Sequence, residues 1–192
     1  MTLNITRHRD ILLQILKEIY SDTTISPFLG FKGGTAALLF YGLDRFSVDL
    51  NFDLLDESKA DFVFKKLKEI VKTYGQIREA RKKRFSLIFI ISYENGTQSI
   101  KIEVNLKNFG SEYELKTYLG ISMLVMKKKD MFAHKLMALR ERTGRANRDI
   151  YDLWFFLKNN WPVSEKIVNS RSGLSLAHVL KDTIFLLKLR LK

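Results

Sequence analysis

Residues 33–53 read GGTAALLFYGLDRFSVDLNFD, and this stretch carries the pattern that decides the fold. Two glycines and Thr35 follow the short apolar stretch 28–31, and the next residues, AALLFY, are apolar throughout. Gly42 is of the residue type that most often ends a helix. From Val48 onward apolar and polar residues alternate, which is typical of a strand with one buried face. The stretch therefore predicts a strand, a tight turn, a helix and a second strand, in that order.

Two of the predicted strands carry polar side chains along one face. Successive side chains of a strand point to opposite faces, so Asp49, Asn51 and Asp53 share one face. In 100–106, IKIEVNL, the same rule places Lys101, Glu103 and Asn105 together on the polar face. If the two strands are neighbours, they gather carboxylates, a costly arrangement that a divalent cation such as Mg²⁺ relieves. The alternative is that these are ordinary solvent-facing strand residues.

The turn before the predicted helix has the composition of a phosphate-binding turn. Gly33 and Gly34 allow the backbone to approach a ligand closely, and a helix that begins there presents N–H groups to a phosphate. The Thr35 hydroxyl is a further donor. Many strand-to-helix turns contain glycine, so the turn alone is weak evidence. Its position about 14 residues before an acidic, alternating strand makes a nucleotide site the stronger interpretation.

The remaining pattern predicts an α+β fold. Helices are expected at 8–20 and 58–74, and strands at 28–31, 48–54, 85–93, 99–106 and, once or twice, within 113–126. Glu94-Asn95-Gly96-Thr97 is typical of a hairpin turn, and no element is predicted for 75–84. In the helix expected at 58–74, the residues on the buried side should be Phe62, Leu67, Ile70 and Val71.

After Lys127-Lys128-Lys129 the pattern becomes helical, with helices expected at 130–142, 148–158, about 163–170 and 175–190. The prediction is a mixed sheet with flanking helices, followed by an all-helical C-terminal part. We place the domains at 1–126 and 127–192.

Composition and charge limit the functional classes. The 192 residues include no cysteine, which excludes thiolate metal sites, disulfides and cysteine nucleophiles. No segment is apolar enough for a signal peptide or a membrane helix, so we expect a cytoplasmic protein without a membrane partner. The formal net charge is +12, with basic runs at 78–84 and 127–129. Such a field indicates nucleic acid, nucleotides or an acidic protein partner, and the alternative is a merely basic surface.

Two stretches together resemble one protein family. FKGGTAALLFYGLDRFSVDLNFD (31–53) is similar to the signature of the AbiEii/AbiGii-type nucleotidyltransferase toxins, within the DNA polymerase β-like superfamily. DMFAHKLMALRERTGRANRDIYDLWFFL (130–157) resembles the later motifs of that family, a helix carrying a lysine and then Arg-Asp-x-x-Asp. The order and spacing match over roughly residues 28–160. The resemblance implies a nucleotidyltransferase core.

The resemblance also implies roles for residues of both stretches. Gly33, Gly34 and Thr35 would hold the phosphates of a nucleoside triphosphate. Asp49 would be a ligand of Mg²⁺ or Mn²⁺. Glu103 is the candidate for the third carboxylate of the family's metal site.

In the later motifs, Lys135 would contact the triphosphate and neutralise charge on the leaving pyrophosphate. Asp149 and Asp152 match the final acidic motif and would orient Lys135 or the attacking group. Each has a structural alternative. Lys135 is a lysine that extends past apolar neighbours, Asp149 is a charge that favours a helix start, and Asp152 is a member of a structural ion pair.

Asn51 departs from the family pattern, which has aspartate there. An amide oxygen still binds Mg²⁺, but the site loses one negative charge.

The resemblance implies transfer of a nucleoside monophosphate to an RNA acceptor such as the tRNA 3′ end, and a cognate antitoxin as partner. Two alternatives stay open: a weakened or silent nucleotide- or RNA-binding relative, and a nucleotidyltransferase that modifies protein. Asp53, on the same face, would compensate for Asn51 only if the strand bends or the metal shifts.

Overall fold

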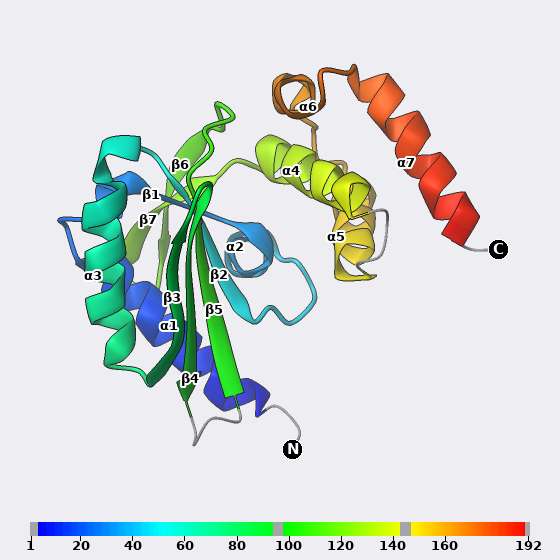
Figure 1. The fold of residues 1–192 in the computed structure, drawn as a ribbon. Helices are drawn as coiled ribbons and strands as arrows, with labels where there is room; N and C mark the ends of the chain where they lie inside the picture. Colours follow the sequence, from blue (N-terminus) through cyan, green and yellow to red (C-terminus); the bar gives the residue numbers. More distant parts are fainter. Residues whose placement is uncertain (1–3, 94–97, 143–146, 191–192) are drawn as a thin grey trace. The chain divides into compact units, whose positions relative to one another are not determined.

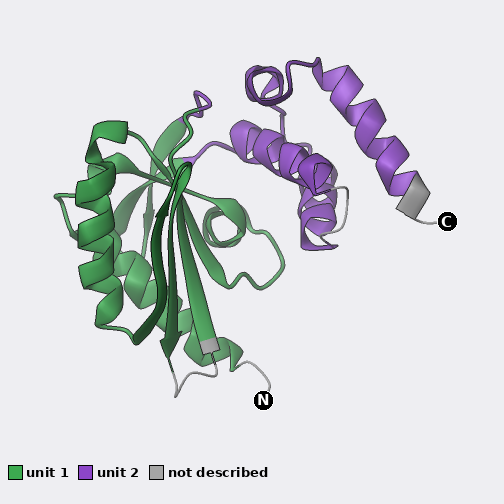
Figure 2. Cartoon of the chain, viewed as in Figure 1, with its two compact units in different colours: residues 1–108, 113–125 green, residues 109–112, 126–192 purple. Residues whose placement is uncertain are grey.

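The computed structural model describes residues 4–93, 98–142 and 147–190. The chain divides into two compact units (Figure 2): unit 1 is Met1–Asn108 with Tyr113–Val125, and unit 2 is Phe109–Glu112 with Met126–Lys192. The predicted domain division at 126/127 stays a prediction, because a compact unit need not fold independently. Among the described residues, no helix has both the length and the apolar character required to cross a bilayer.

Unit 1 is a sheet with helices on both faces (Figure 1). Its strands are β1 (Leu29–Lys32), β2 (Asp49–Leu54), β3 (Gln76–Lys83), β4 (Ser86–Tyr93), β5 (Gln98–Asn105), β6 (Tyr113–Tyr118) and β7 (Ile121–Met126). Its helices are α1 (Ile5–Ser21), α2 (Gly33–Tyr41) and α3 (Ala60–Lys72), with short 3₁₀ turns η1 (Ser26–Phe28) and η2 (Glu57–Lys59). The strand order is β3-β4-β5-β2-β1-β7-β6. β2 pairs with β5, and β1 with β7, in parallel, whereas β1–β2, β3–β4 and β4–β5 are antiparallel. The predicted α+β class with a mixed sheet is confirmed.

The alternation in β2 separates an apolar face from a polar one. Leu50 and Phe52 are fully buried, and the Phe52 ring lies 6.2 Å from the ring of Tyr20 in α1. This face of the sheet is therefore the one covered by α1 and α3, which also pack against each other. The opposite, polar face is the side on which α2 lies (Figure 1).

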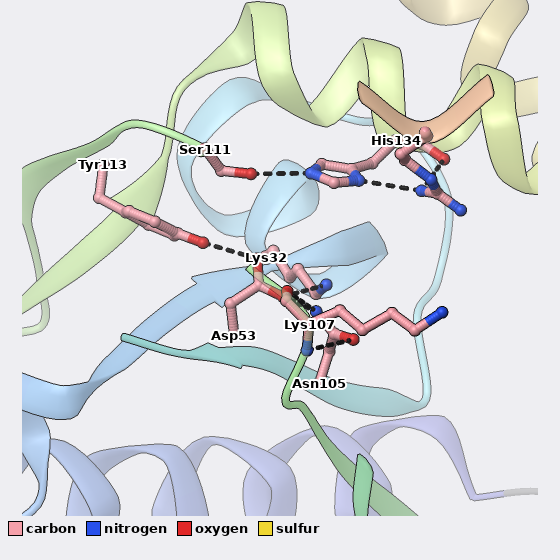
Figure 3. A network of polar contacts seen from close by, with 8 residues as sticks. Lys32, Asp53, Asn105, Lys107, Ser111, Tyr113 and His134 are labelled. Carbon is pink, nitrogen blue, oxygen red and sulfur yellow. Dashed lines mark hydrogen bonds and ion pairs between the residues drawn. The ribbon is translucent and has the colours of Figure 1, made fainter. Parts of the chain in front are cut away.

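Unit 2 is helical, as predicted for the C-terminal part, and consists of α4 (Lys128–Glu141), α5 (Asn147–Lys158), α6 (Glu165–Ser172) and α7 (Leu176–Arg190). Aromatic packing joins its helices: the Phe132 ring lies 5.6 Å from that of Phe156, which stacks on Trp161 at 4.1 Å. Hydrogen bonds attach residues 109–112 to α4. The Glu112 N–H donates to Asp130 at 2.7 Å. Ser111 Oγ lies 2.8 Å from His134 Nε2 (Figure 3).

Two expectations for unit 1 were wrong or incomplete. No element was predicted for 75–84, but residues 76–83 form β3, an edge strand paired with β4. Its residues, QIREARKK, are largely exposed, and most of them are charged. The sequence therefore lacks the apolar–polar alternation that indicates a half-buried strand. Phe62 was expected to be buried, but its side chain is 42% exposed. The predicted hairpin turn at 94–97 lies outside the described residues.

Candidate functional site

The Gly33-Gly34 turn lies against the polar end of β2. Gly33 has φ +79°, a conformation that favours glycine, and a Cβ atom there would lie 3.1 Å from Asn51 Nδ2. A Cβ atom on Gly34 would lie 2.8 Å from Arg45 Nη2 and 3.0 Å from Ser47 Oγ. Both glycines therefore pack closely against the Arg-Phe-Ser-Val-Asp-Leu-Asn segment, and a Cβ atom at either position would make its side chains shift. This packing explains why the two halves of the sequence signature occur together.

The start of α2 has the backbone N–H groups that are common to all helix starts. The first N–H groups of any helix have no intrahelical carbonyl partner. Lys32 is the N-cap residue of α2, and its side chain makes no capping hydrogen bond to this helix end. Free donors at a helix start attract anions such as phosphate.

Thr35 fastens the turn to β2 through its side chain. Its hydroxyl is buried, donates to the carbonyl oxygen of Asp49 at 2.5 Å and lies 2.9 Å from Ser47 Oγ. The hydroxyl is therefore occupied within the protein, whereas the sequence suggested it as an additional phosphate donor. The prediction that Thr35 contacts a phosphate is therefore kept for its backbone N–H group.

The two polar strand faces lie side by side. β2 and β5 pair in parallel with Asp49 opposite Lys101 and Asn51 opposite Glu103, so these side chains share one face. The proximity expected for Glu103 and the β2 acids is thus present. Lys101 and Glu103 form an ion pair with Nζ and Oε2 2.5 Å apart. The alternation of the sequence places Lys101 on this face, and its ion pair with Glu103 adds a positive charge to the group.

The donor set fits a hard divalent cation. No three His, Cys, Asp or Glu side chains of the described residues cluster closely enough to hold a metal ion by themselves. Asp49 and Glu103 are two carboxylates, and Asn51 adds an amide oxygen. Mg²⁺ typically takes one or two protein carboxylates and completes its shell with water and substrate phosphate oxygens. The residues present match that requirement, and their role as ligands stays a prediction.

Asp53 belongs to a different network, shown in Figure 3. Its carboxylate forms an ion pair with Lys32, and it accepts hydrogen bonds from Asn105 at 2.6 Å and from the Tyr113 hydroxyl at 2.6 Å. Asp53 is only 5% exposed. A carboxylate with three partners in a buried site is not available to compensate for the amide of Asn51. In this structure Asp53 therefore does not meet the condition under which the sequence allowed it to compensate.

The electrostatics of Asp53 favour its charged form. Burial by itself would raise the pKa of this carboxyl, but the charge of Lys32 and the hydrogen bonds from Lys32, Tyr113 and Asn105 outweigh burial. The net effect lowers the pKa of Asp53 below its ordinary value. The carboxylate therefore stays ionised and anchors four strands, β1, β2, β5 and β6, at one point.

The predicted residues of the later motifs form their own cluster inside unit 2. Lys135 Nζ lies 3.0 Å from Asp149 Oδ1 and 2.9 Å from Asp152 Oδ2. Arg142 Nη1 also reaches Asp149, at 2.9 Å. Asp149 and Asp152 are buried, whereas the Lys135 side chain keeps 18% exposure. The two carboxylates fix the direction of the lysine, and its contact with a triphosphate stays a prediction.

The basic run 127–129 is partly neutralised within unit 2. Glu112 forms ion pairs with Lys127 at 2.9 Å and Lys129 at 2.6 Å. Hydrogen bonds from the two lysines lower the pKa of Glu112 to about 2. Glu112 lies 15 residues before Lys127, and its role depends on a tertiary contact that no local pattern indicates.

Known proteins share both the sequence motifs and the fold. The sequence model of the nucleotidyl transferase AbiEii toxins of type IV toxin–antitoxin systems matches residues 14–178. JHP933 from Helicobacter pylori has a similar fold with a TM-score of 0.60 and 24% identity, over 82% of this chain and 68% of that chain. An antigenic nucleotidyltransferase-like protein from Paracoccidioides brasiliensis gives a TM-score of 0.56 at 15% identity, over 93% of both chains. A comparison with curated proteins gives no match.

At these identities the two solved structures establish the fold alone. The family match extends from α1 into α7 and includes the turn, the β2 segment and the lysine and aspartates of unit 2. The resemblance seen in the motifs is therefore confirmed. The chain belongs to the family of nucleotidyl transferase AbiEii toxins of type IV toxin–antitoxin systems.

Proposed function

We propose that this chain transfers a nucleoside monophosphate from a nucleoside triphosphate to a hydroxyl of an RNA acceptor, such as the 3′ end of a tRNA, in a metal-dependent reaction. One observation carries the proposal: the Gly33-Gly34 turn packs directly on Asn51, on the strand face that also holds Asp49. A backbone that accommodates phosphates and a set of oxygen ligands thus adjoin each other within unit 1. Family membership supports the same reaction class.

The turn would bind the triphosphate through backbone N–H groups. A Cβ atom at Gly33 or Gly34 would crowd Asn51, Arg45 and Ser47, so glycine lets the turn lie directly against these side chains. A helix start adds a partial positive charge that favours the anionic phosphates.

Asp49, Asn51 and Glu103 would hold Mg²⁺ or Mn²⁺. When bound, such an ion neutralises phosphate charge and polarises the phosphoryl group that is attacked. The protein residues contribute ligand oxygens and a fixed strand geometry. Because the strands are hydrogen-bonded in register, Asn51 and Glu103 keep their spacing without a ligand.

Lys135 would serve the leaving group. An ammonium held by Asp149 and Asp152 has lost most of its rotamer freedom, so less entropy remains to be lost when it contacts a phosphate. A positioned cation stabilises the negative charge that develops on departing pyrophosphate.

An RNA acceptor would meet cations that remain exposed. Glu112 already pairs with Lys127 and Lys129, which weakens the case for 127–129 as a contact with RNA. In the other basic run, Lys83 and Arg84 are exposed at the turn between β3 and β4. Phosphate contacts by such residues give affinity that falls as salt rises. A toxin–antitoxin system also implies an antitoxin partner, which a net charge of +12 would attract if that partner is acidic.

Asn51 supports one further candidate, a weakened or silent relative on the same fold. A neutral ligand in place of a carboxylate lowers the affinity for a divalent cation. In that case the chain would bind nucleotide or RNA without rapid transfer.

One assay separates these functions. Purified protein is incubated with each labelled nucleoside triphosphate, Mg²⁺ and total tRNA, beside Asp49→Ala, Asn51→Asp and the control Asp61→Asn. Asp61 is a matched control because its side chain is 86% exposed. Label in tRNA that Asp49→Ala abolishes and Asp61→Asn preserves supports the transferase. Transfer seen only with Asn51→Asp supports the silent relative, and label found in protein when cell lysate is added identifies a protein acceptor. No transfer by any variant with any acceptor contradicts the proposed reaction.

A further inference from the structure

Lys101 places a positive charge inside the acidic face of the sheet. It lies directly opposite Asp49 in the β2–β5 pairing and two residues before Glu103. Its ammonium contacts Glu103, and the two side chains are 40% and 33% exposed. On the other side of β5, the residues opposite Lys101 and Glu103 are Ile90 and Ile88 of β4. The carboxylates that the register places beside Lys101 are therefore those of the candidate metal site.

The four side chains Asp49, Asn51, Lys101 and Glu103 carry a net charge of only −1. Asp49 and Glu103 contribute two negative charges, Lys101 cancels one, and Asn51 contributes none. Two features reduce the charge independently: an amide where the family pattern has a carboxylate, and an ammonium within the same group of side chains. Affinity for a divalent cation depends on the number of charged ligands.

We propose that Lys101 is a built-in counter-ion of the Asp49–Glu103 pair, which makes this face a weak site for a single divalent cation. The ammonium keeps Glu103 in place and prevents repulsion between the carboxylates while no cation is bound. A divalent cation must displace the ammonium from Glu103 or bind beside it against its charge. Lys101 thus acts as a positioning residue through Glu103, and this inference rests on the proposed function.

An ordinary surface ion pair would behave differently. Exposed pairs contribute little to stability, and removing one normally changes nothing at a distant site. The counter-ion role instead predicts a change in cation affinity with little change in stability. That pair of readouts distinguishes the two roles.

The test is a titration of each protein with Mn²⁺ alone, in which electron paramagnetic resonance measures the free ion. Lys101→Met removes the charge and keeps a long side chain, whereas Lys101→Arg keeps the charge. Lys83→Met is the control, because it removes one positive charge from exposed residues of β3 in the same unit. We expect Lys101→Met to bind Mn²⁺ about tenfold more tightly than wild type, given a unit charge a few ångströms from the ion. Lys101→Arg and Lys83→Met should match wild type, and thermal melts should show that all three variants are folded.

The outcomes separate this inference from the function beneath it. One Mn²⁺ per chain, lost in Asp49→Ala and bound more tightly in Lys101→Met, supports both. Binding that Asp49→Ala abolishes but Lys101→Met leaves unchanged overturns the counter-ion role and leaves the metal site intact. Two ions per wild-type chain also overturn it. If neither wild type, Lys101→Met nor Asn51→Asp binds Mn²⁺, the metal site and this inference are both wrong.

Discussion

Replacing Asp53 with asparagine is expected to destabilise unit 1 strongly, although Asp53 adjoins the candidate site without belonging to it. The substitution keeps the size of the side chain and one carbonyl oxygen, but it removes the negative charge. Lys32 then loses its ionic partner, with its own side chain only 19% exposed. Tyr113 and Asn105 would compete for a single acceptor oxygen in place of a carboxylate.

The size of the effect follows from the burial of the pair. Removing one partner of a buried ion pair costs about 3–5 kcal/mol, since the other charge is left without compensation. Lys32 retains some exposure and can partly hydrate, so we expect a loss of about 3 kcal/mol. That is a large share of the roughly 5–15 kcal/mol that separates folded from unfolded domains.

The same reasoning predicts how stability depends on pH. The pKa of Asp53 is lowered in the folded state, so this carboxyl stabilises the fold fully above its unfolded pKa, about 3.9. The contribution is lost as the pH falls through the folded pKa, because protonation then favours the unfolded chain. Wild type should therefore lose more stability than Asp53→Asn when the pH is lowered from 6 to 3.

Urea unfolding of wild type, Asp53→Asn and the exposed control Asp61→Asn at several pH values measures both effects. The control should lie within about 0.5 kcal/mol of wild type, as is usual for surface substitutions. The reasoning is refuted if Asp53→Asn at pH 7 is as stable as Asp61→Asn, or if its stability falls in acid as steeply as that of wild type.

Three further predictions concern other parts of the chain. In Gly30→Ala a Cβ atom would lie 2.2 Å from Cε1 of the Tyr113 ring, so a loss of more than about 2 kcal/mol is expected in thermal melts. Gly42→Ala is its control, because a Cβ atom there meets no described atom within 4 Å. Only the positive φ of Gly42 then disfavours alanine, at a cost of about 1 kcal/mol. Equal losses of stability in the two variants would contradict the predicted collision at Gly30. Lys135→Met should lower kcat/KM for the nucleoside triphosphate on the order of 10²-fold, the usual cost of one positioned donor, and an unchanged value would exclude the role. Glu112 should titrate near pH 2 in NMR spectra, and a pKa above 4 would contradict its two ion pairs.

Several features of the fold were predictable because local patterns encode them. A period of two in β2 and β5 separated buried from polar side chains correctly, since the pleat of a strand leaves no other arrangement. The glycine turn and Gly42 marked the limits of α2. β3 was missed because an edge strand with exposed, charged residues lacks the alternation on which such a prediction relies. Phe62 was misplaced because helix periodicity does not say where the covered surface ends.

By itself, the sequence determined the family, the mixed α+β class and the set of side chains on the polar face of the sheet. Only the tertiary structure decided what each charge on that face does. Asp53 is committed to Lys32 and Tyr113, whereas Glu103 lies opposite Asn51 and is paired with Lys101. The physical reason is that the fate of a carboxylate depends on its burial and on partners from other strands. Tyr113 is 60 residues from Asp53 in sequence, and only the strand order brings the two side chains together.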